Sequence, residues 1–121
     1  MNRAHKKLDV WKESVALATP IYNVTDKFPK SEIYGLTSQM RRSVISISSN
    51  IAEGAARSSS KEFIHFLNIS CGSLSELDTQ LEIAQNLLFI SSVQKQEIDI
   101  KIESISSKLA GLIKHLKKRE V

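Results

Sequence analysis

A helical apolar stripe between residues 36 and 51 constrains the fold of this chain more than any other feature of its sequence. Apolar side chains recur there at steps of three and four residues: Leu36, Met40, Val44, Ile47 and Ile51. That spacing places them on one side of a helix, facing a core. The neighbouring face carries small polar side chains: Gln39, Ser43, Ser46 and Asn50. Serine and asparagine are mediocre helix formers, and small side chains let another backbone come close, so we interpret this face as a contact surface.

Three further stretches show the same helical pattern, and turn signals separate all four. The expected helices span about residues 8–28, 31–54, 59–89 and 92–117. Ser59 with Glu62, and Ser91 with Gln94, have the spacing of capping boxes at the third and fourth helix starts. Only four glycines and two prolines occur in 121 residues, which favours long helices over many short strands. The sequence predicts an all-α fold: one domain, residues 1–121, forming an up-down-up-down four-helix bundle.

Several single residues carry local expectations. Pro20 removes a backbone hydrogen bond and should kink or divide the first helix. Ser31, followed by Glu32, is expected to cap the second helix. Gly72 is expected to mark a close helix crossing, because glycine inside a helix costs roughly 1 kcal/mol relative to alanine. Cys71, the lone cysteine, is expected to be a buried small hydrophobic residue rather than a nucleophile.

The composition also bears on location. No stretch of about eighteen uncharged apolar residues occurs, so no membrane span is expected. The N-terminal stretch MNRAHKKLDV lacks the apolar core of a secretion signal, and a single cysteine fits a reducing compartment. These features predict a cytoplasmic protein.

Positive charge is expected to gather at one pole of the bundle. In an up-down topology the first and third helices start, and the second and fourth helices end, at the same pole. The cations expected there, and expected to contact nucleic acid, are Arg3, Lys6, Lys7, Arg57, Lys61, Lys114, Lys117, Lys118 and Arg119. The acidic residues Asp9, Glu53, Glu62 and Glu120 dilute this group without cancelling it. With a net charge of +4, the pole could bind RNA or DNA nonspecifically, or it could be a solvated end with cations at helix C-termini.

One short pattern resembles a metal site. Glu62 and His65 have the Glu-x-x-His spacing of dinuclear centres in ferritin-like bundles, but the chain has no second copy of this pattern. No metal and no other cofactor is therefore expected, and His65 is expected to be a surface or interface residue. No arrangement of acid, base and nucleophile recommends an enzyme.

The arginine pair in the middle of the second helix has two interpretations. In antiparallel pairing, Arg41 and Arg42 should lie opposite residues 73–76. The structural interpretation is ion pairing with Glu76 or Asp78, which contributes only about 0–1 kcal/mol when exposed. The alternative is phosphate binding.

Several blocks of the sequence carry a resemblance to a known family. They are Asp9-Val10-Trp11, Phe28-Pro29, YGLTSQMRR (34–42), SNIAEG (49–54), Arg57, and the block from Gly72 to Leu81. Their combination resembles the bacterial four-helix bundle family known from intervening sequences in 23S ribosomal RNA genes, over nearly the whole chain. The resemblance implies a bundle, commonly assembled as a ring of five subunits, with no established enzymatic activity. A related branch is the accessory protein of diversity-generating retroelements, in which a basic pentamer engages nucleic acid and the reverse transcriptase.

Self-association is favoured by the residues as well as by the resemblance. The side chains expected at an interface between subunits are Trp11, Arg42, Ser43, Ser46, Asn50, Phe66, Ile69 and Ser73. In a cyclic ring all basic poles point the same way, so a modest charge per subunit becomes a concentrated patch. We therefore expect a noncatalytic homo-oligomer, a pentamer by the resemblance, that contacts RNA or DNA through its basic pole. The alternative is a scaffold that binds a protein partner and has no nucleic-acid role.

Overall fold

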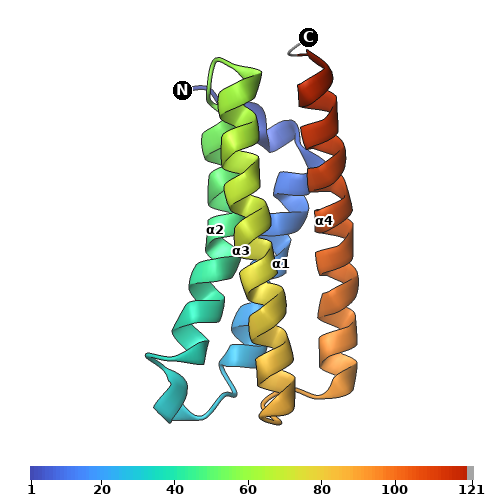
Figure 1. The fold of residues 1–121 in the computed structure, drawn as a ribbon. Helices are drawn as coiled ribbons and strands as arrows, with labels where there is room; N and C mark the ends of the chain where they lie inside the picture. Colours follow the sequence, from blue (N-terminus) through green and yellow to red (C-terminus); the bar gives the residue numbers. More distant parts are fainter. Residues whose placement is uncertain (120–121) are drawn as a thin grey trace.

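Four long helices pack side by side in the computed structural model, which describes residues 1–119 (Figure 1). They are α1 (Asp9–Thr25), α2 (Leu36–Ala55), α3 (Ser60–Asn86) and α4 (Ser92–Arg119). Two short 3-10 helices, η1 (Ala4–Lys7) and η2 (Lys30–Glu32), precede α1 and α2. Residues 1–119 contain no strand, which confirms the predicted all-α fold.

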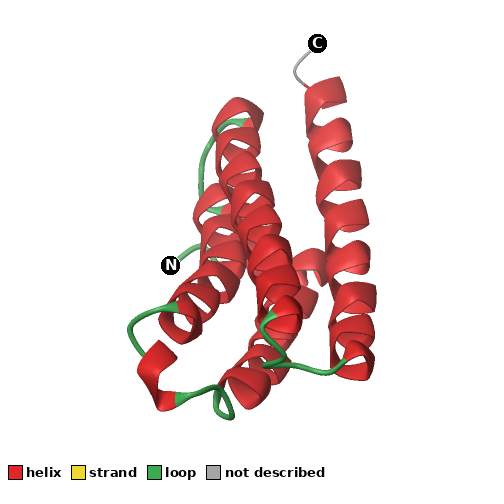
Figure 2. Cartoon of the chain, turned by 60° about the horizontal axis from the view of Figure 1, so that its bottom comes forward, coloured by secondary structure: helices red, strands yellow, loops and turns green. Residues whose placement is uncertain are grey.

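The helices alternate in direction, as the sequence predicts for an up-down-up-down bundle. Each packs against its neighbours along the chain, and α1 closes the bundle against α4. The start of α1, the α2–α3 turn and the end of α4 lie at the top of Figure 1. The α1–α2 and α3–α4 connections lie together at the opposite pole, which comes forward in Figure 2. The α2–α3 pair makes the most extensive contact.

The core consists of the apolar stripes of all four helices. The large apolar side chains that are essentially inaccessible to solvent are Leu17, Ile21, Met40, Val44, Ile47, Ile51, Leu67, Leu77, Leu81, Ile105 and Leu109. Burying such a side chain contributes about 1.5–3 kcal/mol relative to leaving it exposed. The stripe predicted between residues 36 and 51 is confirmed, with Leu36 at its edge packed partly buried against the core.

The start of α2 differs from the prediction. Helix α2 begins at Leu36. Ser31 lies five residues earlier, in η2, and does not cap α2. The backbone of this connection is held by short-range bonds, among them Glu32 N to Pro29 O at 2.9 Å, which form a 3-10 turn before the helix. The Glu32 side chain supplies the cap, because its Oε1 accepts a hydrogen bond from Leu36 N at 3.1 Å. A Cβ at Gly35 would lie 2.8 Å from that oxygen, so the glycine makes room for the cap.

The other helix ends differ from the prediction by a few residues. The first helix ends at Thr25 rather than 28, and the third at Asn86 rather than 89, where the chain leaves in a Schellman-type turn. Leu88 has a left-handed φ of 65°, and Phe89 N donates to Ala84 O at 2.8 Å. The fourth helix continues to Arg119.

Local expectations inside the helices have mixed outcomes. The predicted caps are confirmed: Ser59 Oγ accepts from Glu62 N at 3.1 Å, and Ser91 and Gln94 exchange bonds of 2.9 and 3.1 Å. Pro20 does not divide the first helix, since α1 continues through it as one element. The expectation for Gly72 is wrong, because a Cβ there would meet nothing within 4 Å.

Candidate subunit interface and basic pole

A polar groove of about 510 Å³ runs between α2 and α3. The residues that line it are Gln39, Arg42, Ser43, Ser46, Ile69, Ser73, Glu76 and Gln80. Five of these were predicted to lie at a subunit interface: Arg42, Ser43, Ser46, Ile69 and Ser73. Asn50 adjoins the groove, and its Nδ2 donates to Ser46 O at 2.9 Å and to Ser46 Oγ at 3.0 Å. The predicted α2 face and the α3 flank therefore form one surface.

Small side chains bring α2 and α3 close together beneath this groove. Ser73 Oγ donates to Ser46 Oγ at 2.8 Å, and the buried Ser70 Oγ donates to Ile47 O at 2.8 Å. Ser43 and Ser73 are already buried within the chain. The small polar face of α2 thus makes a close helix contact as predicted, but largely with α3 of the same chain. The expectation that Ser43 of α2 and Ser73 of α3 stay exposed for a neighbouring subunit is wrong, because both are buried within the chain.

Helices α2 and α3 also approach each other closely near the basic pole, at Gly54. A Cβ on Gly54 would lie 2.8 Å from Phe66 Cβ and 2.9 Å from Phe63 Cδ1. From the sequence, Gly54 was expected to end the second helix, and the close helix crossing was expected at Gly72. Gly54 continues the apolar stripe of α2, three residues after Ile51, whereas Gly72 lies on the exposed side of α3. The packing of α2 on α3 shows that the close approach is at Gly54.

Gln80 carries a buried acceptor in the groove that has no hydrogen-bond partner among the described residues. Its side chain is 8% exposed, and its Oε1 is enclosed and unpaired there. An unpaired buried acceptor costs about 1–3 kcal/mol, and native structures leave few of them. Sequence reasoning missed this residue, although Gln80 follows Ser73 and Glu76 by seven and four residues, which places it on the same helix face.

The arginine pair is used differently from the predicted ion pairing. Arg41 Nε donates to Thr25 Oγ1 at 3.0 Å, and its guanidinium lies 4.5 Å from the centre of the Tyr22 ring. Arg41 therefore joins α2 to α1. Arg42 and Glu76 line the same groove, which confirms the predicted register. None of the four ion pairs within residues 1–119 includes either arginine, so the predicted pairing with Glu76 or Asp78 is wrong.

Two of the predicted interface residues lie away from the groove. Trp11 is half-buried on α1, where its ring meets His5 edge-on at 4.8 Å. Phe66 is half-buried near the α2–α3 turn, with the Arg57 guanidinium 4.8 Å from the centre of its ring. Each ring therefore already contacts a side chain of the same chain, His5 for Trp11 and Arg57 for Phe66.

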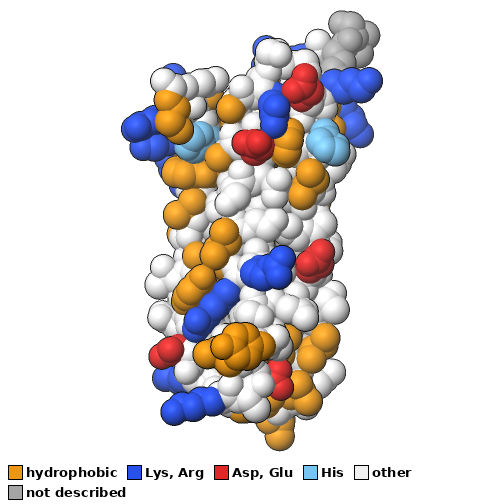
Figure 3. All heavy atoms as spheres, turned by 90° about the vertical axis from the view of Figure 1, so that its left-hand side faces the viewer, with side chains coloured by type: hydrophobic (Ala, Val, Ile, Leu, Met, Phe, Trp, Pro, Cys, Tyr) orange, Lys and Arg blue, Asp and Glu red, His pale blue; other side chains and the backbone are white. Residues whose placement is uncertain are grey.

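The nine cations expected at one pole do lie there. They belong to η1 and the residue before it, the α2–α3 turn, the first turn of α3 and the last turns of α4. All nine are exposed. Arg57 is the one that forms an ion pair within the described residues, with Glu53 at 2.9 Å. Figure 3 shows lysine, arginine and histidine side chains at this pole, with acidic side chains between them. Glu120, expected to dilute the charge, lies outside the described residues.

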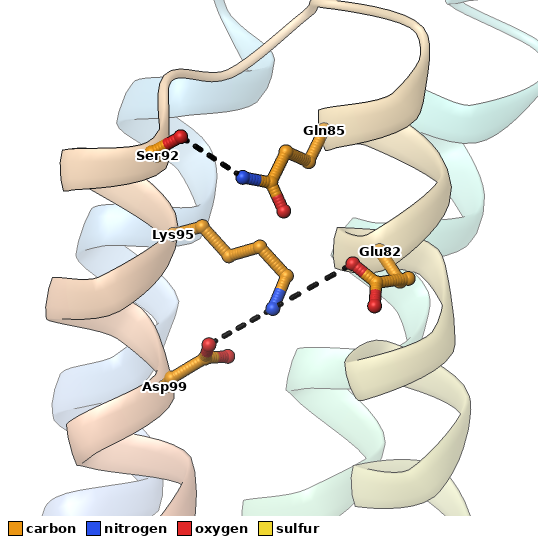
Figure 4. A network of polar contacts seen from close by, with 5 residues as sticks. All are labelled: Glu82, Gln85, Ser92, Lys95 and Asp99. Atoms are coloured by element: carbon orange, nitrogen blue, oxygen red, sulfur yellow. Dashed lines mark hydrogen bonds and ion pairs between the residues drawn. The ribbon is translucent and has the colours of Figure 1, made fainter.

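Ion pairs on the other side of the bundle attach α4 to its neighbours. Lys95 Nζ lies 2.9 Å from Asp99 Oδ2 and 3.8 Å from Glu82 Oε2, beside the Gln85–Ser92 hydrogen bond of 3.2 Å (Figure 4). The hydrogen bond to Asp99 and the charges of nearby carboxylates raise the pKa of Lys95 above its ordinary value. This network joins α4 to α3.

A second cluster joins α4 to α1. Glu13 accepts hydrogen bonds from Lys108 and from Ser104 Oγ, the latter at 2.6 Å. The Lys108 bond is the main cause that lowers the pKa of Glu13, and the Ser104 bond adds to it. Both clusters connect α4 to a neighbouring helix and lie outside the groove.

The other candidates for chemistry are a metal site, His65 and Cys71. No group of three or more histidine, cysteine or acidic side chains in residues 1–119 is arranged to hold a metal ion. Within the same residues, no helix combines the length and apolar character needed to cross a membrane. His65 is exposed and meets Phe66 edge-on at 5.2 Å. Cys71 is half-buried rather than fully buried as expected, and burial raises the pKa of its thiol.

Comparison with known proteins gives a family and a structural neighbour. The family described as 23S rRNA-intervening sequence protein matches residues 6–111. A crystal structure from Bacteroides thetaiotaomicron, of a protein of unknown function from the S23 ribosomal protein family, is similar, with 27% identity and a TM-score of 0.80. The similarity covers 87% of this chain and 98% of that one. No curated protein matches. With 106 of its 121 residues matched, the chain belongs to the family of 23S rRNA-intervening sequence proteins.

Proposed function

We propose that this protein is a noncatalytic homo-oligomer that binds RNA or DNA nonspecifically through its basic pole. The observation that carries the proposal is the gathering of nine exposed cations at one end of the bundle. Such an arrangement favours phosphate backbones through electrostatics alone. It offers no base-reading motif, so the expected binding is independent of nucleotide sequence.

The α2–α3 groove supports the oligomer part of the proposal. Gln80 Oε1 is a buried acceptor that a donor from a second copy would pair. Arg42 and Glu76 place both signs of charge along the groove, and Ile69 leaves 39% of its surface exposed beside them. A neighbouring chain that covers this groove would remove the apolar surface of Ile69 from water and could also donate a hydrogen bond to Gln80 Oε1. The subunit number of five comes from the family resemblance.

The nucleic-acid part is tested by fluorescence anisotropy with a labelled single-stranded RNA and the matching DNA over a range of salt concentrations. Affinity should fall steeply with salt, by a slope of about 0.7 in log–log terms for each phosphate contacted. Replacing Lys6, Lys7 and Lys61 by Gln should lower that slope by about 2, and lower affinity at least tenfold at low salt.

The matched control removes three exposed cations away from this pole, with Lys27, Lys30 and Lys101 replaced by Gln. Both triple variants change the net charge equally, so a local contact predicts a loss only in the first. Equal losses in both, or no binding by the assembled protein at low salt, would remove this part of the proposal.

The oligomer part is tested by multi-angle light scattering on the purified chain. Because Ser43 is already buried, an arginine there would disturb folding, and exposed groove residues make better probes. Arg42→Glu with Ile69→Asp should reduce the mass to that of one chain, whereas Ile100→Asp on the exposed side of α4 should not. A monomeric wild type contradicts this part.

The scaffold alternative rests on the same groove. A protein partner could cover Ile69 and pair Gln80 as well as a second copy could. Co-purification of one defined protein that survives nuclease treatment and is lost in the Arg42→Glu, Ile69→Asp variant would favour it.

A further inference from the structure

A second groove, of about 600 Å³, lies between α3 and α4 near the basic pole. The residues that line it are Cys71, Ser106, Ala110, Ile113, Lys114, Lys117 and Lys118. It shares no residue with the α2–α3 groove, and none of its described lining residues is acidic. Neither the proposed nucleic-acid contact nor the proposed subunit interface includes Cys71, Ser106, Ala110 or Ile113.

The uncharged and charged residues of this groove occupy different ends. Ser106, Ala110 and Ile113 follow one another along one face of α4, whereas Lys114, Lys117 and Lys118 lie in the next turn toward the pole. At about 1.5 Å per residue, the uncharged stretch spans about 10 Å and the lysines about 6 Å. Cys71 adds a half-buried thiol from α3. The groove thus has an uncharged end, whose floor is formed by the apolar side chains of Ala110 and Ile113, and a second end with three cations.

This separation selects among possible ligands. A nucleic-acid backbone carries charge along its whole length, so it would be matched by cations along the whole groove rather than at one end. An acidic amphipathic helix likewise carries its charges along its length, so it would need cations along the whole groove. A ligand with one anionic end and an apolar remainder matches both ends of the site.

We propose that the α3–α4 groove binds a free long-chain carboxylate, with its head group at Lys114, Lys117 and Lys118 and its hydrocarbon chain along Ala110 and Ile113. The lysine ammonium groups would neutralise the carboxylate, and their methylene stems would extend the apolar surface. The proposal rests on different residues from the α2–α3 interface and does not depend on nucleic-acid binding.

Cys71 provides a direct reporter, because it is the only cysteine in the chain and it lines the groove. The test measures alkylation of the full chain by iodoacetamide at pH 8, with laurate below its critical micelle concentration. Laurate should slow the reaction at least fivefold, in a saturable way. From decanoate to laurate the affinity should rise by up to about fourfold for each added methylene group, as burial of hydrocarbon predicts.

Variants separate the two ends of the site. Lys114→Gln, Lys117→Gln and Lys118→Gln together should weaken laurate at least tenfold, while the Lys27, Lys30 and Lys101 variant described above should bind it normally. Ala110→Glu places a negative charge on the floor at an exposed position, so it should abolish protection without unfolding the helix. A thermal melt by circular dichroism checks that each variant is folded.

Four outcomes would overturn the proposal. Absence of protection by laurate excludes the ligand. Equal protection by laurate and dodecanol shows that the lysines recognise no anion. Protection by a short RNA but not by laurate makes the site a phosphate surface. Protection that rises with protein concentration in the absence of laurate makes the groove a contact between copies of the chain.

Discussion

Ser73 Oγ donates a 2.8 Å hydrogen bond to Ser46 Oγ and thereby joins α3 to α2 at the base of the polar groove. The contact exists because both residues are small enough for the two helices to approach. Replacing Ser73 by Leu should force the helices apart and cost about 1–3 kcal/mol of unfolding free energy through overpacking. Urea unfolding followed by circular dichroism measures this change. Ser49→Leu, on an exposed part of α2, should stay within about 0.5 kcal/mol of the wild type.

The two helical glycines of α2 and α3 should respond to alanine with opposite signs. Gly54→Ala places a Cβ 2.8 Å from Phe66 Cβ and should destabilise the chain by about 1–3 kcal/mol. Gly72→Ala meets nothing within 4 Å and should stabilise it by about 0.4–1 kcal/mol, through helix propensity and a less flexible unfolded chain. Thermal melts of the two variants compare these effects directly. Stabilisation by Gly54→Ala would contradict the close α2–α3 approach.

Leu88 is a non-glycine residue in the left-handed region, and its side chain is 89% exposed. Leu88→Gly should therefore stabilise the protein by about 1 kcal/mol, because the strain of the Cβ disappears and almost no buried surface is lost. The matched variant, Leu87→Gly, changes a residue with an ordinary φ of −81° and should be destabilising. Chemical unfolding of both variants checks the sign.

Glu13 makes the stability depend on pH. Its pKa is lowered below its ordinary value of 4.5, chiefly by the hydrogen bond from Lys108. A lowered folded-state pKa means that the ionised form stabilises the fold above the unfolded pKa, and that this contribution disappears as pH falls through the folded pKa. Glu13→Gln should therefore lower the melting temperature at pH 7, and this difference should shrink as the pH falls below 4.5 and through the folded-state pKa. Glu97→Gln, at an exposed position of α4 outside the described ion pairs, removes the same charge and is the matched control.

The effect of replacing Gln80 depends on whether a second copy of the chain covers the groove. If its Oε1 lacks a partner in solution, Gln80→Met removes an unpaired buried acceptor and should stabilise the chain by about 1–3 kcal/mol. If a second copy supplies a donor, the same variant should leave the fold intact and weaken assembly instead. Light scattering across a dilution series, together with a thermal melt, separates the two results.

Much of the fold was predictable because it depends on local patterns. The stripe from Leu36 to Ile51, the caps at Ser59 and Ser91, and the scarcity of glycine and proline predict four helices and their order. Because the connections are short, consecutive helices run antiparallel, and this direction places the nine cations at one pole. The start of α2 was missed because the cap comes from Glu32, a side chain four residues before the helix, rather than from Ser31.

The candidate site was predictable only in part. The sequence placed Ser43, Ser46 and Ser73 on facing helices, since their spacing determines the face on which each lies. Only the tertiary structure showed that two of them are buried within one chain, that Arg41 contacts α1, and that Gln80 holds an unpaired acceptor. Periodicity specifies the direction of a side chain about its own helix axis. The distance between two helices depends on every side chain packed between them, so only the fold shows that the close approach is at Gly54 and not at Gly72.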